Sequence, residues 1–120
     1  MKKLIVVLVL LLAASTVTVF AQSIDGKWLD SNWDAVWEIS ASITGVNVRL
    51  LGTNGNLIYN FSGMMQDREF SNEGLNAVLS FKCDDVGRSY RFVTNLPGSN
   101  LTMVIKRPNE PDYTVNMPKQ

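Results

Sequence analysis

The side chains that most often carry enzyme chemistry are scarce in this chain of 120 residues. It contains no histidine, the commonest general base and transition-metal ligand. Cys83 is the only cysteine, so it has no partner for an intramolecular disulfide. Without a histidine in the chain, its thiol also lacks the usual activating base. Ser-x-x-Lys spacings and glycine-rich phosphate loops are also missing. The sequence therefore predicts a protein without catalytic activity and without a cofactor.

Two pairs of carboxylates are the remaining candidates for metal or acid–base chemistry. Asp84 and Asp85 are adjacent, and Asp30 and Asp34 flank a short polar segment. The first pair could bind Ca²⁺ or act as an acid and a base, and the second could bind a hard cation. Aspartate is also a common turn residue, because its side chain hydrogen-bonds the backbone that follows it. We interpret both pairs as turn or loop residues and predict no metal site.

A set of large side chains is better suited to binding than to catalysis. With the alternation of a β-strand, these side chains fall on one face of the predicted sheet. An apolar lining with a few hydroxyl groups suits a small apolar ligand. The candidate ligand-binding residues are Trp37, Tyr59, Phe61, Phe81, Tyr90, Phe92, Met103 and Tyr113. The alternative is a core that these side chains fill completely, as they can in barrels of about eight strands.

The elements that would hold these residues are short strands, separated by turn signals about every 8–12 residues. Polar and apolar residues alternate along them, as expected for an antiparallel sheet with one solvated face. Cys83 continues the inward series of its strand and is predicted to be a small buried hydrophobe. A short ninth candidate surrounds Phe70 at 66–71. The other strand candidates lie at 24–30, 35–43, 46–52, 57–62, 76–83, 88–95, 100–107 and 112–117.

Turn residues predict how the first strands pair. Asn54-Gly55 is a strong signal for a two-residue hairpin turn, and it places Leu50 opposite Tyr59. A turn centred on Thr44-Gly45 places Ile39 opposite Leu50 on the other side. Both hairpins put the same apolar residues on one face, and a slip of one residue would reverse every side chain.

The later strands give the same result. An even-numbered loop over 84–87 places Leu79 opposite Phe92, and a turn on Pro97-Gly98 places Phe92 opposite Met103. We therefore predict an all-β fold, an antiparallel up-and-down meander of about eight strands that closes into a small barrel. Closure would remove the exposed sheet edges. The alternative is a two-sheet β-sandwich, which normally needs longer connections than this chain offers.

The N-terminal residues predict export. Lys2 and Lys3 precede an apolar run at 4–14, and Val19-Phe20-Ala21 supplies small residues where a signal peptidase cuts. We predict a cleaved signal peptide at 1–21 and a single domain at 22–120, located in the periplasm or secreted. An uncleaved membrane anchor is the alternative, but polar residues interrupt the run before the ~20 apolar residues that a span needs.

The charge balance argues against nucleic acid as a partner. Removing Lys2 and Lys3 from the eleven basic residues leaves nine against eleven acidic ones. Nucleic-acid binders need a concentrated positive surface. No later apolar run has the length of a transmembrane segment, so none is expected after signal removal.

The tripeptide Gly26-Lys27-Trp28 on the first predicted strand resembles the opening of the calycins, which include lipocalins, fatty-acid-binding proteins and avidins. The resemblance implies that Trp28 plugs one end of a barrel and that a basic residue of a late strand packs on its ring. Lys106 or Arg107 would take that place. The chain is thus similar to a small bacterial lipocalin-like domain.

We therefore expect an exported, non-catalytic lipocalin-like protein that binds a small apolar ligand in the barrel interior. The alternative is an extracytoplasmic protein-binding or inhibitor module that acts on an envelope protein through loops or an outer sheet face. For that alternative, Trp33 is a candidate anchor. Leu51 opposite Ile58 would form part of an apolar outer surface.

Overall fold

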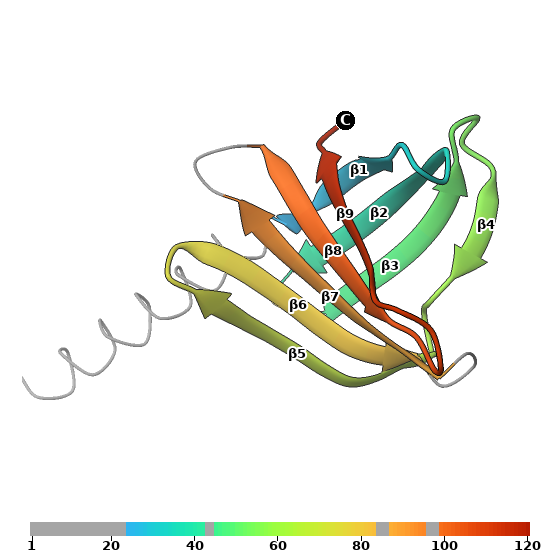
Figure 1. Ribbon diagram of the computed structural model, residues 1–120. Helices are drawn as coiled ribbons and strands as arrows, with labels where there is room; N and C mark the ends of the chain where they lie inside the picture. Colours follow the sequence, from blue (N-terminus) through green and yellow to red (C-terminus); the bar gives the residue numbers. More distant parts are fainter. Residues whose placement is uncertain (1–23, 43–44, 84–86, 96–98) are drawn as a thin grey trace, which may run out of the picture.

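The computed structural model describes residues 24–42, 45–83, 87–95 and 99–120, which form nine strands (Figure 1). None of these segments contains a helix with the length and apolar character needed to cross a lipid bilayer. The strands are β1 (Gly26–Asp30), β2 (Ala35–Ser42), β3 (Gly45–Gly52), β4 (Leu57–Asn60), β5 (Met65–Glu73), β6 (Asn76–Cys83), β7 (Arg88–Asn95), β8 (Asn100–Lys106) and β9 (Tyr113–Pro118).

Several sequence predictions fall outside the described residues. These are the signal peptide at 1–21, the Asp84-Asp85 turn, the Pro97-Gly98 turn and Thr44 of the first hairpin turn. The other predicted strands occur within a few residues of their expected bounds. The weak candidate at 66–71 is a full strand, β5, which is nine residues long.

The strands form two antiparallel sheets, each in chain order: β1-β2-β3-β4 and β5-β6-β7-β8-β9. The all-β antiparallel meander is therefore confirmed. Strand pairing among the described residues does not run around a closed barrel, and it agrees with the two-sheet alternative. After β4, the Phe61 N–H donates to the Val48 carbonyl at 3.0 Å, and the chain turns through Ser62–Met64. β5 then pairs with β6 rather than with β4.

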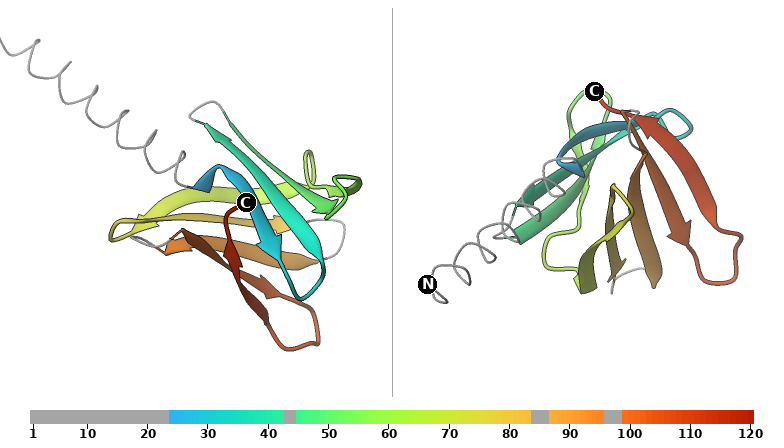
Figure 2. Two further views of the ribbon diagram at one scale, coloured as in Figure 1. Left: turned by 90° about the horizontal axis from the view of Figure 1, so that it is seen from above. Right: turned by 90° about the vertical axis from the view of Figure 1, so that its left-hand side faces the viewer.

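The two sheets meet where β1 lies beside β9 (Figure 2). Trp28 and Lys119 form an isolated bridge there. The Gln120 N–H also donates to the Lys27 carbonyl at 2.8 Å. Few backbone hydrogen bonds thus join the sheets at this edge, and the side chains between them must supply most of the attraction.

Most of the predicted registers are confirmed. Leu50 lies opposite Tyr59, Leu79 opposite Phe92, and Phe92 opposite Met103. Leu51 is an exception, because the turn after it is longer than two residues. Gly52 N–H donates to the Asn56 carbonyl at 2.8 Å, and the ladder shifts between Leu50 and Leu51.

This bulge corrects the predicted outer surface. Leu51 pairs with Leu57 instead of Ile58, and it is buried, with 6% of its surface exposed. Ile58 remains exposed. The two residues therefore do not form the continuous apolar surface expected from an uninterrupted ladder.

The predicted register of β2 and β3 is wrong by two residues. Ile39 lies opposite Val48, and Leu50 lies opposite Trp37. The observed register pairs all eight residues of β2 with all eight of β3. The predicted register would have placed Ala35 and Val36 opposite turn residues and left their backbone groups without ladder partners. An even shift keeps every side chain on its predicted face.

The core lies between the inner faces of the two sheets. Cys83 is buried in it, as predicted, and carries a free thiol. Thr94, also buried, accepts a hydrogen bond from the Ala77 N–H at 2.9 Å. The largest fully buried side chains of the core are Trp28, Trp37, Phe92, Ile24, Ile39, Leu79, Leu101, Met103, Ile105, Met117 and Val48.

Trp28 is buried in this core. Its indole N–H donates to the Ile24 carbonyl at 3.0 Å, and Lys119 Nζ lies 5.5 Å from its ring centroid. The predicted cation on this ring, Lys106 or Arg107, is therefore wrong, because β9 rather than β8 lies beside β1. Gly26 has φ +140°, and a Cβ there would lie 2.7 Å from Lys119 Cε.

Replacing Phe92 by alanine tests the shared core. Phe92 has no exposed surface, and its ring lies 5.7 Å from that of Trp37 on the opposite sheet. We expect Phe92→Ala to lower the free energy of unfolding by about 3–5 kcal/mol, measured by urea denaturation. The exposed Ile58→Ala is the control and should change it by less than about 0.5 kcal/mol. Equal, small losses in both variants would contradict the proposed core.

Candidate functional site

A small aromatic pocket opens at one end of the interior, with a volume of about 180 Å³. Residues of both sheets and of the loop between β1 and β2 line it. They are Trp33, Trp37, Leu50, Tyr59, Phe61, Arg88 and Tyr90. Four of the predicted binding residues line this pocket: Trp37, Tyr59, Phe61 and Tyr90.

The strand pattern explains why these side chains meet. Trp37 and Leu50 are opposite each other on β2 and β3, and Tyr59 is the next partner across on β4. On the second sheet, Arg88 and Tyr90 are two residues apart on β7, so both face inward. The short β4 and the bulge beside it leave Leu50 and Tyr59 only half-buried. The interior is therefore open at this end.

Phe61 joins the rings of the pocket. Its centroid lies 4.6 Å from that of Tyr59, 5.6 Å from that of Trp37 and 5.1 Å from that of Tyr90. The contacts with both tyrosines are edge-to-face, which aromatic pairs favour. A planar ligand entering the pocket would thus meet ring faces and ring edges on several sides.

A buried carboxylate positions the outer wall of the pocket. Asp30 Oδ1 accepts hydrogen bonds from the N–H groups of Asn32 at 3.1 Å and Trp33 at 3.3 Å. The Tyr113 hydroxyl donates to both Asp30 carboxylate oxygens at 3.0 Å. Trp33 stacks on Tyr113, with centroids 4.1 Å apart. Asp30 therefore works as a turn residue, which agrees with the sequence interpretation, and it fixes the ring of Trp33.

The polar atoms of the pocket are mainly hydrogen-bond donors. The Trp37 indole N–H is buried and has no acceptor. The Tyr59 hydroxyl lies 3.9 Å from Cys83 Sγ. Burial raises the pKa of Tyr90 above its ordinary value of 10.0, and the hydrogen bond and positive charge of Arg88 oppose that rise. Arg88 is thus a hydrogen-bonding neighbour of Tyr90, and both residues line the pocket.

The structure divides the eight predicted binding residues into three groups. Trp37, Tyr59, Phe61 and Tyr90 line the aromatic pocket. Tyr113 lies behind Trp33. The remaining three belong to the filled part of the core, where Phe92 and Met103 have no exposed surface and Phe81 packs against other rings.

Three pocket residues were not among the predicted binding residues: Trp33, Leu50 and Arg88. Leu50 could have been found from its predicted position opposite Tyr59. Arg88 could have been found because it shares the inward face with Tyr90 by simple alternation, although arginine side chains are usually exposed. Trp33 lies in a loop, where alternation gives no direction.

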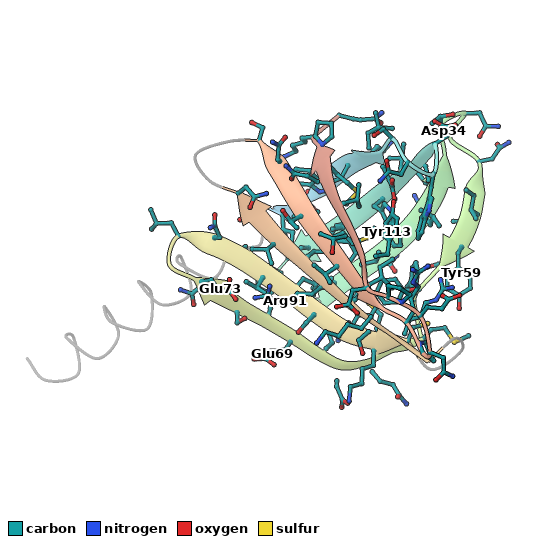
Figure 3. All side chains as sticks on the ribbon, viewed as in Figure 1. Asp34, Tyr59, Glu69, Glu73, Arg91 and Tyr113 are labelled. Atoms are coloured by element: carbon teal, nitrogen blue, oxygen red, sulfur yellow. The ribbon has the colours of Figure 1, made fainter. Side chains whose placement is uncertain are left out.

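A larger, more open groove of about 640 Å³ lies on the outer face of the second sheet. Lys82 pairs with Asp67 across it at 3.6 Å. Arg91 forms an ion pair with Glu73, and the two side chains lie over β5 to β7 (Figure 3). The other residues that line this groove are Glu69, Ser80, Phe81, Ser89, Tyr90, Val104 and Lys106.

Within the described ranges, no group of three or more histidine, cysteine, aspartate or glutamate side chains could hold a metal ion. Comparisons with protein-family models, curated proteins and solved structures find no match to this chain. The resemblance to the calycins therefore stays a prediction.

The raised pKa of Tyr90 predicts an alkaline loss of stability. Because the folded state holds this proton more tightly than the unfolded state, stability is complete below about pH 10 and falls as pH rises through the folded pKa. We expect Tyr90→Phe to remove part of that fall. Urea denaturation at about pH 8 and about pH 11 would measure it.

Between about pH 8 and about pH 11, the wild type should therefore lose more of its free energy of unfolding than Tyr90→Phe does. The pKa of Tyr113 is also raised, by burial and by Asp30, while its hydrogen bond with Asn32 lowers it. Tyr113 therefore accounts for part of the alkaline loss of stability that remains in Tyr90→Phe. Parallel stability curves for the two proteins would contradict this assignment.

Proposed function

We propose that this protein binds a small, ring-sized apolar ligand in the aromatic pocket between its two sheets. The observation that carries the proposal is the lining of the pocket, in which Trp37, Tyr59, Phe61 and Tyr90 converge from three strands and the segment after β4. Aromatic and apolar walls with a few polar groups are typical of small-molecule sites.

The pocket volume limits the size of the ligand. Sites for drug-sized molecules usually hold ~300–1,000 Å³, and this pocket has about 180 Å³. An engineered apolar cavity of about 150 Å³ can bind benzene. The deeper interior offers no room, because Phe92 and Met103 are fully buried there. A single ring with a small substituent therefore suits the pocket better than a long acyl chain.

The carrier role includes two further inferences. The protein is exported, as the N-terminal sequence predicts, and its two sheets approximate a lipocalin-like barrel. Contacts on both sides support the second inference. Trp28 and Lys119 link the sheets at one edge, and on the other side the Arg68 Nη1 donates to the Val46 carbonyl at 3.2 Å.

The alternative function, binding of another protein on an outer sheet face, would use the open groove over β5 to β8. Its lining includes the ion pair of Lys82 with Asp67, and Arg91 is paired with Glu73. A partner would have to compete with these pairs or tolerate them. The aromatic pocket has mainly apolar walls and no ion pair within its lining, so we place ligand binding first.

Tryptophan fluorescence is a direct test, because Trp33 and Trp37 line the pocket. We expect a saturable change on titration with single-ring compounds such as toluene and benzyl alcohol. Dodecanoate, whose chain exceeds the pocket, should give no comparable saturation. The absence of saturation with every ring compound would overturn the proposal.

A variant that fills the pocket gives a second test. Leu50 is half-buried and lines the pocket, so Leu50→Phe would place a ring where the ligand lies. We expect it to weaken binding of single-ring compounds by more than about tenfold, which corresponds to about 1.4 kcal/mol. Leu57→Phe makes the same change at an exposed site on β4 and should leave binding unchanged. Equal affinities for the two variants would place the ligand elsewhere.

A further inference from the structure

A single positive charge lies in the wall of the aromatic pocket. Arg88 begins β7, is half-buried, and faces inward with Tyr90. The other lining residues carry no charge at neutral pH. Arg88 therefore gives this otherwise apolar pocket a net positive character.

Three of the other four arginines form ion pairs: Arg49 with Glu38, Arg91 with Glu73, and Arg107 with Glu110. The fourth, Arg68, donates to the Val46 carbonyl outside the aromatic pocket. Among the ion pairs formed by described residues, none includes Arg88. Its contact with the Tyr90 hydroxyl engages a neutral group and leaves the charge uncompensated within this part of the chain.

The polar side chains that share the pocket lining with Arg88 can also donate hydrogen bonds. A guanidinium and an indole N–H can only donate hydrogen bonds, and phenol hydroxyls can also donate. The pocket thus holds donors but no carboxylate, and a ligand with acceptor oxygens would complement it.

We propose that the ligand of this pocket is a monocyclic aromatic carboxylate, with its ring among Trp37, Phe61 and Tyr90 and its carboxylate on Arg88. The guanidinium fork matches the geometry of a carboxylate and forms two parallel charge-assisted hydrogen bonds with it. Partial burial strengthens that interaction relative to water. This inference rests on the proposed function and specifies the chemical class of its ligand.

The first experiment compares ligands of one shape on the full domain at neutral pH. Benzoate and benzamide have the same ring and nearly the same outline, but only benzoate is charged. We expect benzoate to bind at least about tenfold more tightly, by fluorescence titration. Raising the salt concentration should reduce the advantage of benzoate, because the guanidinium is only half-buried. This comparison needs no variant, so it is independent of any effect on folding.

The second experiment removes the cation. Arg88→Gln should lower benzoate affinity to that of benzamide and change benzamide affinity by less than about twofold. Arg88→Lys keeps the charge but loses the fork, so it should retain only part of the preference. Arg49→Gln is the matched control: it removes the same charge from an outward-facing side chain that pairs with Glu38, and the preference should persist.

The outcomes separate the two proposals. If benzamide and toluene bind but benzoate binds no more tightly, the carboxylate assignment is wrong and the aromatic pocket stands. If benzoate is preferred and Arg49→Gln abolishes the preference as Arg88→Gln does, the effect is general electrostatics and the role of Arg88 is wrong. If no ring compound binds, the proposed function fails and this inference fails with it.

Discussion

The packing of Trp37 across the interior is the interaction on which the rest of the structure depends. Its ring belongs to the first sheet and lies 6.0 Å from Tyr90 and 5.7 Å from Phe92 of the second sheet. A buried aromatic side chain removes ~150–250 Å² from water, which corresponds to an upper estimate of about 4–6 kcal/mol. A single backbone hydrogen bond contributes about 1 kcal/mol. Side-chain burial therefore outweighs the few backbone bonds between the sheets, and no intramolecular disulfide can assist because Cys83 is alone.

The same packing explains why the pocket is small and where it lies. Around Phe92 and Met103 the two inner faces interlock completely. Toward Tyr59 the first sheet ends in a four-residue strand beside a bulge, so fewer side chains are available to fill the space. Protein cores normally leave few voids larger than a water molecule. A hollow beside the irregular ladder is thus a local departure from core packing, lined by strands of both sheets and by Trp33 of the loop between β1 and β2.

Alternation along the strands predicted much of the fold, because it specifies which side of the sheet each residue faces. Leu50, Tyr59, Phe92 and Met103 were all placed inward correctly by this rule. It could not fix the register of β2 against β3, since a shift of two residues leaves the faces unchanged.

The architecture and the site were harder to predict for related reasons. A closed barrel and a pair of facing sheets need the same inward pattern, so alternation could not separate them. At the site, Arg88 was not predicted: alternation with Tyr90 would have placed it inward, but arginine is usually exposed to solvent. The position of the Trp33 ring depends on its stacking against Tyr113, which is held by Asp30, and no local pattern contains that contact.

Gly26 and Lys119 are ninety-three positions apart, yet their geometries are linked through the ring of Trp28. The lysine stem occupies the space that a β-carbon at position 26 would need, and the backbone there has a φ angle that favours glycine. A methyl group at that position would displace the ammonium group from the indole as well as strain the strand. In evolutionary terms, the two sites are expected to vary together. Descendants that keep Lys119 should keep Gly26. Descendants that lose Lys119 remove the steric constraint on position 26, but the φ angle there still favours glycine.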